Sequence, residues 1–290
     1  MSLSSKKILK KRRFIEKCFK IFSILITFSA VLLLIILLTH IIRSGAQWFD
    51  WQFLTSLPSR KPSRAGIYTA IFGSLWLMMT TVAFAIPLGI GSAIFLEEYA
   101  GKNRLSRFID VNVSNLAGVP SIVYGLLGLA IFVHYFNFGR SILSGGLTLA
   151  LLILPVIIIT TRGALQSVPK SIPFAAYALG AKKWQVILFH TLPYALPGIL
   201  TGIILSISRA IGETAPLIII GAATYVAFTP ESIMDEFTAM PIQIFNWTSR
   251  PQEDFHSLSA AGIIILLAVM FTMNSVAIYL RNKFQRTKND

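Results

Sequence analysis

The stretch Tyr194–Ala222, which reads YALPGILTGIILSISRAIGETAPLIIIGA, decides the fold of this chain. It is apolar and long enough to cross a bilayer as a helix, which needs about 20 such residues. Two charged residues interrupt it, Arg209 and Glu213. A charge at membrane depth is costly and points by default to a functional role. The stretch therefore predicts both a membrane span and a candidate site.

The composition of the whole chain indicates an integral membrane protein built of helices. Of its 290 residues, 54% are hydrophobic and 13% are charged, whereas a soluble domain is typically about 25% charged. Several long uncharged runs can each cross the hydrocarbon core as a helix. The net charge is +14, but the basic residues lie between and beside these runs. That placement favours membrane lipids as the partner, with no nucleic-acid motif to suggest otherwise.

Six transmembrane helices are expected from the alternation of apolar and polar runs. The first follows a basic N-terminus and is too long to be the apolar region of a cleaved signal peptide. Pro87 can bend the second, and the third is interrupted at Gly118 and Pro120. The expected spans are 21–42, 67–96, 113–136, 144–161, 194–222 and 258–280.

The basic residues also predict the orientation of the chain. Most of the 26 Lys and Arg residues lie at the N-terminus, in two loops and in the C-terminal tail, so these segments and both termini are expected in the cytoplasm. Glu97 and Glu98, where the second span ends, are expected to face water. The predicted parts are a cytoplasmic N-terminus, a first span with an external segment, a five-helix transmembrane domain and a cytoplasmic tail. Their bounds are 1–20, 21–66, 67–281 and 282–290.

The cytoplasmic loop 162–194 has a pattern of its own, RGALQSVPKSIPFAAYALGAKKWQVILFHTLPY. Residues 174–179 favour a helix, and Gly180 permits a turn or a left-handed helix end. A second amphipathic stretch follows over 182–190. The pattern predicts a short helix–turn–helix outside the membrane, although on periodicity alone an ordinary interfacial loop fits equally well.

This loop resembles the EAA loop of binding-protein-dependent ABC importer permeases. The family pattern is Glu-Ala-Ala, three residues, Gly, nine residues, then Ile-x-Leu-Pro. Phe174 stands where the family has glutamate, and His190 where it has isoleucine. The resemblance implies a coupling helix that docks on an ATP-binding subunit. The residues that match, and to which this role is carried, are Ala175, Ala176, Gly180, Leu192 and Pro193.

Arg209 and Glu213 are spaced so that they can pair on one helix face. In one interpretation they form a structural ion pair that joins two helices. In the other, Arg209 meets an anionic substrate in the pathway and Glu213 orients its guanidinium, whose planar fork suits phosphate. Ser208 and Thr214 offer further hydrogen bonds to a substrate.

Three blocks resemble phosphate-transport permeases of the PstA type, and they are SRAIGETAP from Ser208, NLAGVPSIVYGLLGL from Asn115 and IPLGIGSAIFLEEY from Ile86. The resemblance implies a type I ABC importer permease, MetI-like in fold, in the bacterial inner membrane. It also implies that the chain forms half of a pathway for inorganic phosphate. The implied partners are a PstC-like second permease, two PstB-like ATP-binding subunits and a PstS-like phosphate-binding protein.

The chain itself is not expected to be an enzyme. It lacks the G-x-x-x-x-G-K-[ST] motif that cradles nucleotide phosphates, so ATP hydrolysis is assigned to a partner subunit. Its histidines lack metal-ligand spacing, Cys18 is alone, and neither a metal nor a cofactor is expected. Two alternatives stay open, namely a permease for another oxyanion such as molybdate or sulfate, and a non-conducting membrane scaffold or sensor.

Overall fold

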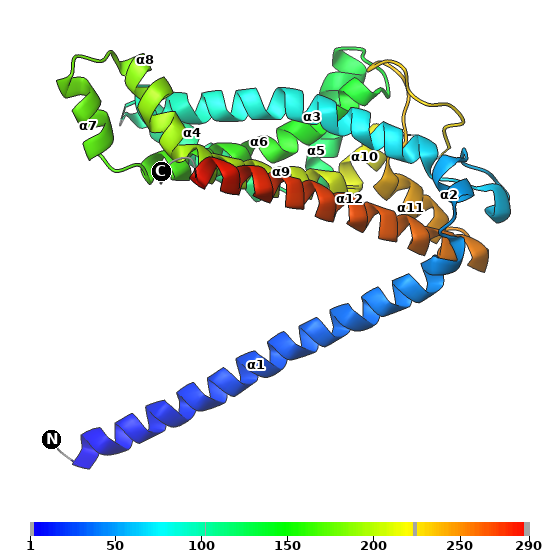
Figure 1. Ribbon diagram of the computed structural model, residues 1–290, viewed down its shortest axis with the longest axis horizontal. Helices are drawn as coiled ribbons and strands as arrows, with labels where there is room; N and C mark the ends of the chain where they lie inside the picture. The colour runs from blue at the N-terminus through cyan, green and yellow to red at the C-terminus, as the bar shows by residue number, and fades with distance from the viewer. Residues whose placement is uncertain (1–2, 102, 223–224, 287–290) are drawn as a thin grey trace.

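The computed structural model describes residues 3–101, 103–222 and 225–286, and within them the chain is helical (Figure 1). Five helices are long and apolar enough to cross a membrane, and a sixth crossing is possible if one bent pair of helices counts as a span. The described ranges hold no strand beyond one isolated bridge between Ser141 and Glu236. The predicted class, an all-helical integral membrane protein, is confirmed.

Long helices alternate with shorter segments that cap or connect them. The long helices are α1 (Leu3–Gly45), α3 (Tyr68–Ile94), α6 (Ile142–Gln166), α9 (Leu192–Gly212) and α12 (Glu253–Arg286). The shorter α-helices are α2 (Trp51–Thr55), α4 (Arg104–Ala117), α5 (Ser121–Gly128), α7 (Ser171–Ala178), α8 (Lys183–Val186), α10 (Ala215–Ile220) and α11 (Met240–Thr248). Two 3₁₀ turns, η1 (Ala46–Trp48) and η2 (Pro62–Arg64), and three π-helical turns, η3 (Phe95–Tyr99), η4 (Leu129–Tyr135) and η5 (Ile187–Thr191), complete the order.

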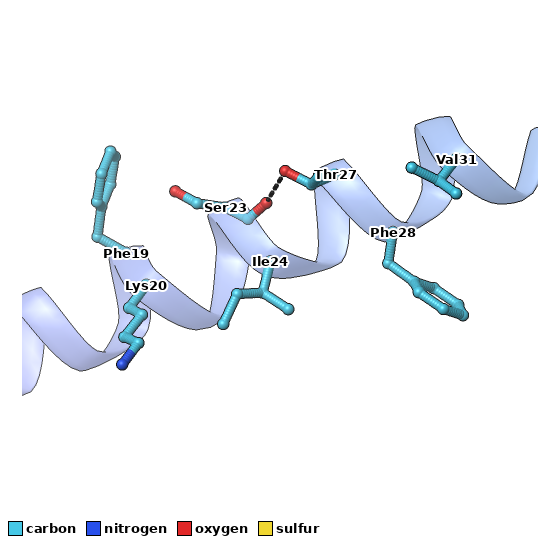
Figure 2. A pocket seen from close by; sticks show the side chains of 7 residues that line it. All are labelled: Phe19, Lys20, Ser23, Ile24, Thr27, Phe28 and Val31. Atoms are coloured by element: carbon cyan, nitrogen blue, oxygen red, sulfur yellow. Dashed lines mark hydrogen bonds between the residues drawn. The ribbon is translucent and has the colours of Figure 1, made fainter. Parts of the chain in front are cut away.

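The first helix stands apart from the bundle (Figure 1). None of its most apolar window is buried, and Figure 2 shows side chains such as Phe19, Phe28 and Val31 projecting from the helix into open space. Its far end is anchored, because Gly45 lies directly against the backbone of Ala260 and Ala261 in α12. Residues 3–20 of the predicted N-terminal segment 1–20 are part of this helix.

The core of the bundle forms where α3, α6 and α9 cross. Small residues let these backbones approach closely, as is usual between membrane helices. A side chain at Gly146 would collide with Thr80, and one at Gly202 would collide with Thr160. The hydroxyl of Thr81 donates to the Gly146 carbonyl (3.2 Å) and ties α3 to α6.

The third predicted span, 113–136, needs correction. The chain forms two helices, α4 and α5 with η4, that meet at an angle of 105°. Pro120 is the cause, because it lacks an N–H group and takes an extended ψ of 137° immediately before α5. The polar connection between the second and third predicted spans is therefore partly helical, since α4 already begins at Arg104. Lys102 of that connection lies outside the described residues.

The fifth predicted span, 194–222, is also two helices. The helix α9 ends at Gly212, Glu213 is extended, and α10 begins at Ala215. Pro216 explains the break, because its ring would clash with the carbonyl four residues earlier, that of Gly212. The two broken segments meet in space, since a side chain at Gly125 of α5 would strike Pro216.

The segments predicted to be external pack over one end of the bundle. In that cap Phe53 of α2 lies against Trp247 of α11, with ring centroids 5.7 Å apart, and both are buried together with Phe255. The stretch between the fifth and sixth predicted spans therefore contains a buried helix, α11. At the other terminus α12 continues to Arg286, into the predicted tail, and residues 287–290 lie outside the described part.

Candidate functional site

The charged pair lies at the break between α9 and α10. Arg209 is in the last turn of α9, and Glu213 is the residue at which that helix ends. The Arg209 Nε donates to Glu213 Oε1 at 3.3 Å, so the structure brings the two predicted partners together. The Arg209 side chain is 41% exposed and that of Glu213 is 16% exposed. The carboxylate is thus the more enclosed partner and can hold the guanidinium in place.

Much of the Arg209 guanidinium is available to a ligand. Only Nε enters the ion pair, and the two Nη groups form no hydrogen bond with any described residue. An arginine fork with its outer nitrogens unused can bind two oxygens of a planar or tetrahedral anion. The geometry therefore permits anion binding without breaking the pair with Glu213.

The other two residues predicted for this site differ in position. Thr214 is half-buried within the break itself, directly before α10. Ser208 is committed to a helix contact, since its hydroxyl lies 2.5 Å from Asn274 Oδ1 of α12 and 2.8 Å from the Ile204 carbonyl. Arg209, Glu213 and Thr214 are thus grouped at the break, whereas Ser208 joins α9 to α12.

One residue near the site was not singled out from the sequence. Tyr124 of α5 is buried, and its hydroxyl donates to the Leu116 carbonyl across the bend between α4 and α5 (2.8 Å). Tyr124 belongs to the same buried apolar cluster as Ala210 and Ile211 of α9. Tyr124 lies inside the block NLAGVPSIVYGLLGL, which carried a resemblance but gave no reason to prefer this residue. It links the first helix break to the second.

The loop 162–194 forms the predicted helix–turn–helix. The helix α7 is followed by Gly180 at φ +83°, in the left-handed region that favours glycine, and then by α8. The helix α8 continues through η5 into α9. Figure 1 shows α7 and α8 at the opposite end of the molecule from α11, so the loop and the cap occupy opposite ends of the bundle.

The surface of this loop is mainly apolar. Phe174 is 66% exposed and Leu179 is 90% exposed, and Ala175 and Gly180 are also exposed. Ala176 is buried within the chain and supports the loop from inside. Leu192 is half-buried and Pro193 is exposed at the start of α9. Of the residues predicted to couple to an ATPase, Ala175, Gly180 and Pro193 are therefore accessible.

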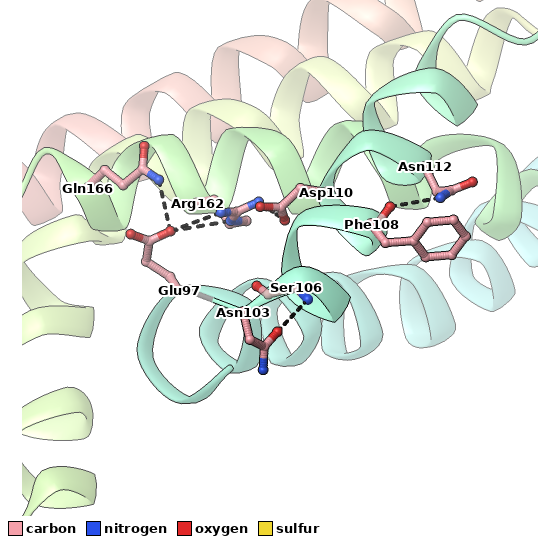
Figure 3. A network of polar contacts seen from close by, with 8 residues as sticks. All are labelled: Glu97, Asn103, Ser106, Phe108, Asp110, Asn112, Arg162 and Gln166. Atoms are coloured by element: carbon pink, nitrogen blue, oxygen red, sulfur yellow. Dashed lines mark hydrogen bonds and ion pairs between the residues drawn. The ribbon is translucent and has the colours of Figure 1, made fainter. Parts of the chain in front are cut away.

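A polar network ties three segments together near this loop (Figure 3). The Arg162 guanidinium forms ion pairs with Glu97 of η3 (3.3 Å) and with Asp110 of α4, and Gln166 donates to Glu97 at 2.8 Å. The three charged side chains are a third exposed or less. The expectation that Glu97 only faces water is wrong, because Arg162 reaches it from 65 residues further along the chain.

No group of three or more His, Cys, Asp or Glu side chains that could hold a metal ion occurs among the described residues. Cys18 is exposed on α1. The chemistry available at these sites is therefore ion pairing and hydrogen bonding by Arg209, Arg162 and their carboxylate partners.

The chain has several long apolar helices, and two of its predicted spans are broken near charged or polar residues. These features are typical of multi-pass membrane proteins of the transporter class. The family described as binding-protein-dependent transport system inner membrane component matches residues 85–286. The chain belongs to this family, which confirms the resemblance first seen in the loop 162–194.

Several curated relatives are similar over most of their length. The chain is 30% identical over 260 residues to the probable ABC transporter permease protein YqgI of Bacillus subtilis, covering 86% of this chain and 88% of that protein. It is 33% identical over 243 residues to the phosphate transport system permease protein PstA 1 of Mycobacterium tuberculosis, covering 82% and 77%. With PstA of Xylella fastidiosa the identity is 28% over 289 residues, covering 99% and 100%.

Solved structures share the fold. A chain of the inward-facing MetNI methionine ABC transporter aligns with a TM-score of 0.60 at 15% identity, covering 75% of this chain and 97% of that one. A chain of a bacterial alginate ABC transporter, in complex with its alginate pentasaccharide-bound periplasmic protein, aligns with a TM-score of 0.67 at 15% identity, covering 93% and 96%. These similarities confirm the predicted ABC importer permease fold.

Proposed function

We propose that this chain is the membrane-spanning permease subunit of an ATP-driven phosphate importer and forms half of the pathway for inorganic phosphate. The observation that carries the proposal is the Arg209–Glu213 pair at the α9–α10 break, with two guanidinium nitrogens unused by described residues. Relatives named phosphate transport permeases support phosphate as the anion. Guanidinium nitrogens match the geometry of phosphate oxygens.

The importer divides its work among several subunits. A PstC-like permease supplies the other half of the pathway, and a PstS-like protein delivers phosphate from outside. Two PstB-like subunits hydrolyse ATP, which fits the lack of a nucleotide-binding P-loop sequence in this chain. The exposed apolar residues Phe174 and Leu179 of the loop 162–194 provide a surface to which the ATPase can bind.

The transport cycle couples ATP binding to two states of the permease pair. The ATPases close on ATP and push on the loop, the pathway opens outward, and phosphate enters from the binding protein. Hydrolysis returns the pair to the inward state. Such a cycle requires that each ligand binds one state better than the other. Arg209 provides that difference if only one state presents its guanidinium to the pathway.

Replacing Arg209 tests the anion role. We expect Arg209→Ala to abolish phosphate uptake by the complete complex in proteoliposomes, because losing a charged contact costs about 3 kcal/mol, roughly a hundredfold in affinity. Arg64→Ala, at an exposed arginine in η2, is the control and should transport normally. Normal uptake by an assembled Arg209→Ala complex would overturn the role.

Competition identifies the anion. Excess molybdate or sulfate should leave phosphate uptake unchanged if phosphate is the substrate. Strong inhibition by one of them, with its own ATP-dependent uptake, would instead assign the permease to that oxyanion. A wild-type complex that assembles and moves none of the three would favour a non-conducting scaffold or sensor.

A further inference from the structure

The π-helical turn η3, where the second span ends, is contacted from two sides. Three consecutive residues, Glu97, Glu98 and Tyr99, receive these contacts. One set comes from the loop 162–194, and the other comes from the Arg162 network. Single π-helical turns inside α-helices are rare and are frequently found at functional sites.

Lys183 makes the contact from the loop. Its Nζ donates to the Glu98 carbonyl and lies over the Tyr99 ring, 4.7 Å from the ring centroid. Lys183 is the first residue of α8, three residues after the left-handed Gly180. A movement of the loop therefore acts on η3 through this side chain. The ammonium is exposed, and exposed charge contacts contribute little to stability, so removing it should leave the fold intact.

Arg162 carries the connection further. Its guanidinium joins Glu97 of η3 to Asp110 of α4 (Figure 3). Gln166, which lies on α6 like Arg162, also donates a hydrogen bond to Glu97. Because one planar fork holds both carboxylates, η3 and α4 cannot shift independently of α6 without breaking a charged hydrogen bond. Arg162 thus converts a displacement of η3 into one of α4.

The helix α4 leads to the other end of the connection. Its C-terminal turn supplies the Leu116 carbonyl that binds Tyr124 of α5, and Gly125, the next residue, packs against Pro216 just beyond the Arg209–Glu213 break. The contacts therefore form a continuous series from the loop, through η3 and α4, to the charged pair.

We infer that Lys183 and Arg162 are positioning residues that transmit the movement of the loop 162–194 to the α9–α10 break, with η3 as the moving part between them. The inference rests on the proposed function, since it assumes that an ATPase acts on this loop. It assigns to Lys183 a role in coupling that is separate from holding the ATPase.

Lys183→Met tests this role because it removes the ammonium and keeps the length of the side chain. In proteoliposomes with all subunits, we expect the variant complex to assemble and to hydrolyse ATP, while the phosphate imported per ATP hydrolysed falls by about tenfold, a typical magnitude of coupling between sites. Lys183→Arg should keep most of the coupling, because a guanidinium can also donate to a carbonyl and lie over an aromatic ring. Lys182→Met removes the same charge one residue earlier and should behave as the wild type.

A second measurement does not depend on the identity of the anion. In a Cys18→Ser background, Gly118→Cys places a thiol at the α4–α5 bend, where a Cβ would have only an ordinary contact with the Asn115 carbonyl. We expect ATP to change the rate at which a maleimide labels this thiol in the complex, and Lys183→Met to remove most of that change.

The outcomes separate the two proposals. If the wild type imports no phosphate but ATP changes labelling and Lys183→Met suppresses the change, the substrate assignment fails and the coupling role stands. If the wild type imports phosphate and Lys183→Met imports it with the same ATP cost and the same labelling change, the coupling role is wrong. A Lys183→Arg variant as poorly coupled as Lys183→Met would also contradict the role of the charge.

Discussion

At the scale of single residues, Arg209 has to satisfy two requirements that conflict. Glu213 offsets the cost of placing its charge in a membrane span, but a fully paired arginine would attract an anion weakly. The geometry resolves the conflict, because only Nε is engaged and the carboxylate is the more enclosed of the two groups. In the proposed importer, the second permease would add the rest of the positive field.

Removing both charges separates the structural and functional interpretations of this pair. In Arg209→Met/Glu213→Gln the shapes are similar and neither charge is left unpaired, so a purely structural pair should be replaceable at little cost. We expect the double variant to assemble as well as the wild type but to remain inactive in phosphate uptake. Restored uptake would make the pair structural only, whereas Glu213→Gln alone should lower the yield of assembled complex.

The residues of the site were not equally predictable from the sequence, and the reasons are physical. The pair was predictable, because both residues lie four apart on one element and the membrane makes their charge conspicuous. The environment of Glu97 was not, because its partner Arg162 is distant in the sequence and reaches it only when α3 and α6 pack. Ser208 was predicted as a pathway residue, but its hydroxyl is engaged by Asn274 of α12, a contact that no local pattern encodes.

At the scale of elements, two prolines break predicted spans, but only one of these breaks could be predicted from the sequence. Pro120 and Gly118 signalled an interruption, but the 105° angle between α4 and α5 depends on what each helix packs against. Pro216 can loosen a helix, but the sequence around it did not predict the end of α9, because the apolar run on either side of it is continuous. The left-handed Gly180 was predictable, since the turn chemistry there is local.

The loop allows a sharp test of docking at Gly180. A Cβ there would meet no atom within 4 Å, so a large side chain projects away from the chain. We expect Gly180→Trp to release the ATPase or abolish phosphate-stimulated ATP hydrolysis, because the indole would occupy the docking surface. Copurification of the ATPase and hydrolysis rates measure the effect.

Gly180→Asn is the matched control. A side chain at φ +83° costs about 1–2 kcal/mol, but asparagine tolerates this region better than most residues. It should therefore retain most of the docking, which separates backbone strain from obstruction of the surface. Normal phosphate-stimulated ATP hydrolysis in the Gly180→Trp complex would contradict the docking role of this turn.

At the scale of the whole molecule, the helix α1 and the cap are the parts that lie outside the central bundle. None of the most apolar window of α1 is buried, and the described part of this helix meets α12 near Gly45. The five long apolar helices could be predicted because apolar length is a direct property of the sequence. The path of the third span could not, because it is set by contacts with α6 and α10.

Orientation in the membrane is the property of the whole molecule that most needs a test. The basic residues favour both termini and the loop 162–194 on the cytoplasmic side, since each Lys or Arg near an anionic leaflet contributes about 1 kcal/mol. We expect a fluorescent protein fused after Asp290 to fluoresce, and alkaline phosphatase fused after Arg64 to be active, because the first folds in the cytoplasm and the second only outside. The reciprocal fusions should be dark and inactive, respectively, and serve as controls. Active alkaline phosphatase at the C-terminus would reverse the orientation and would leave the loop 162–194 on the wrong side for any contact with an ATPase.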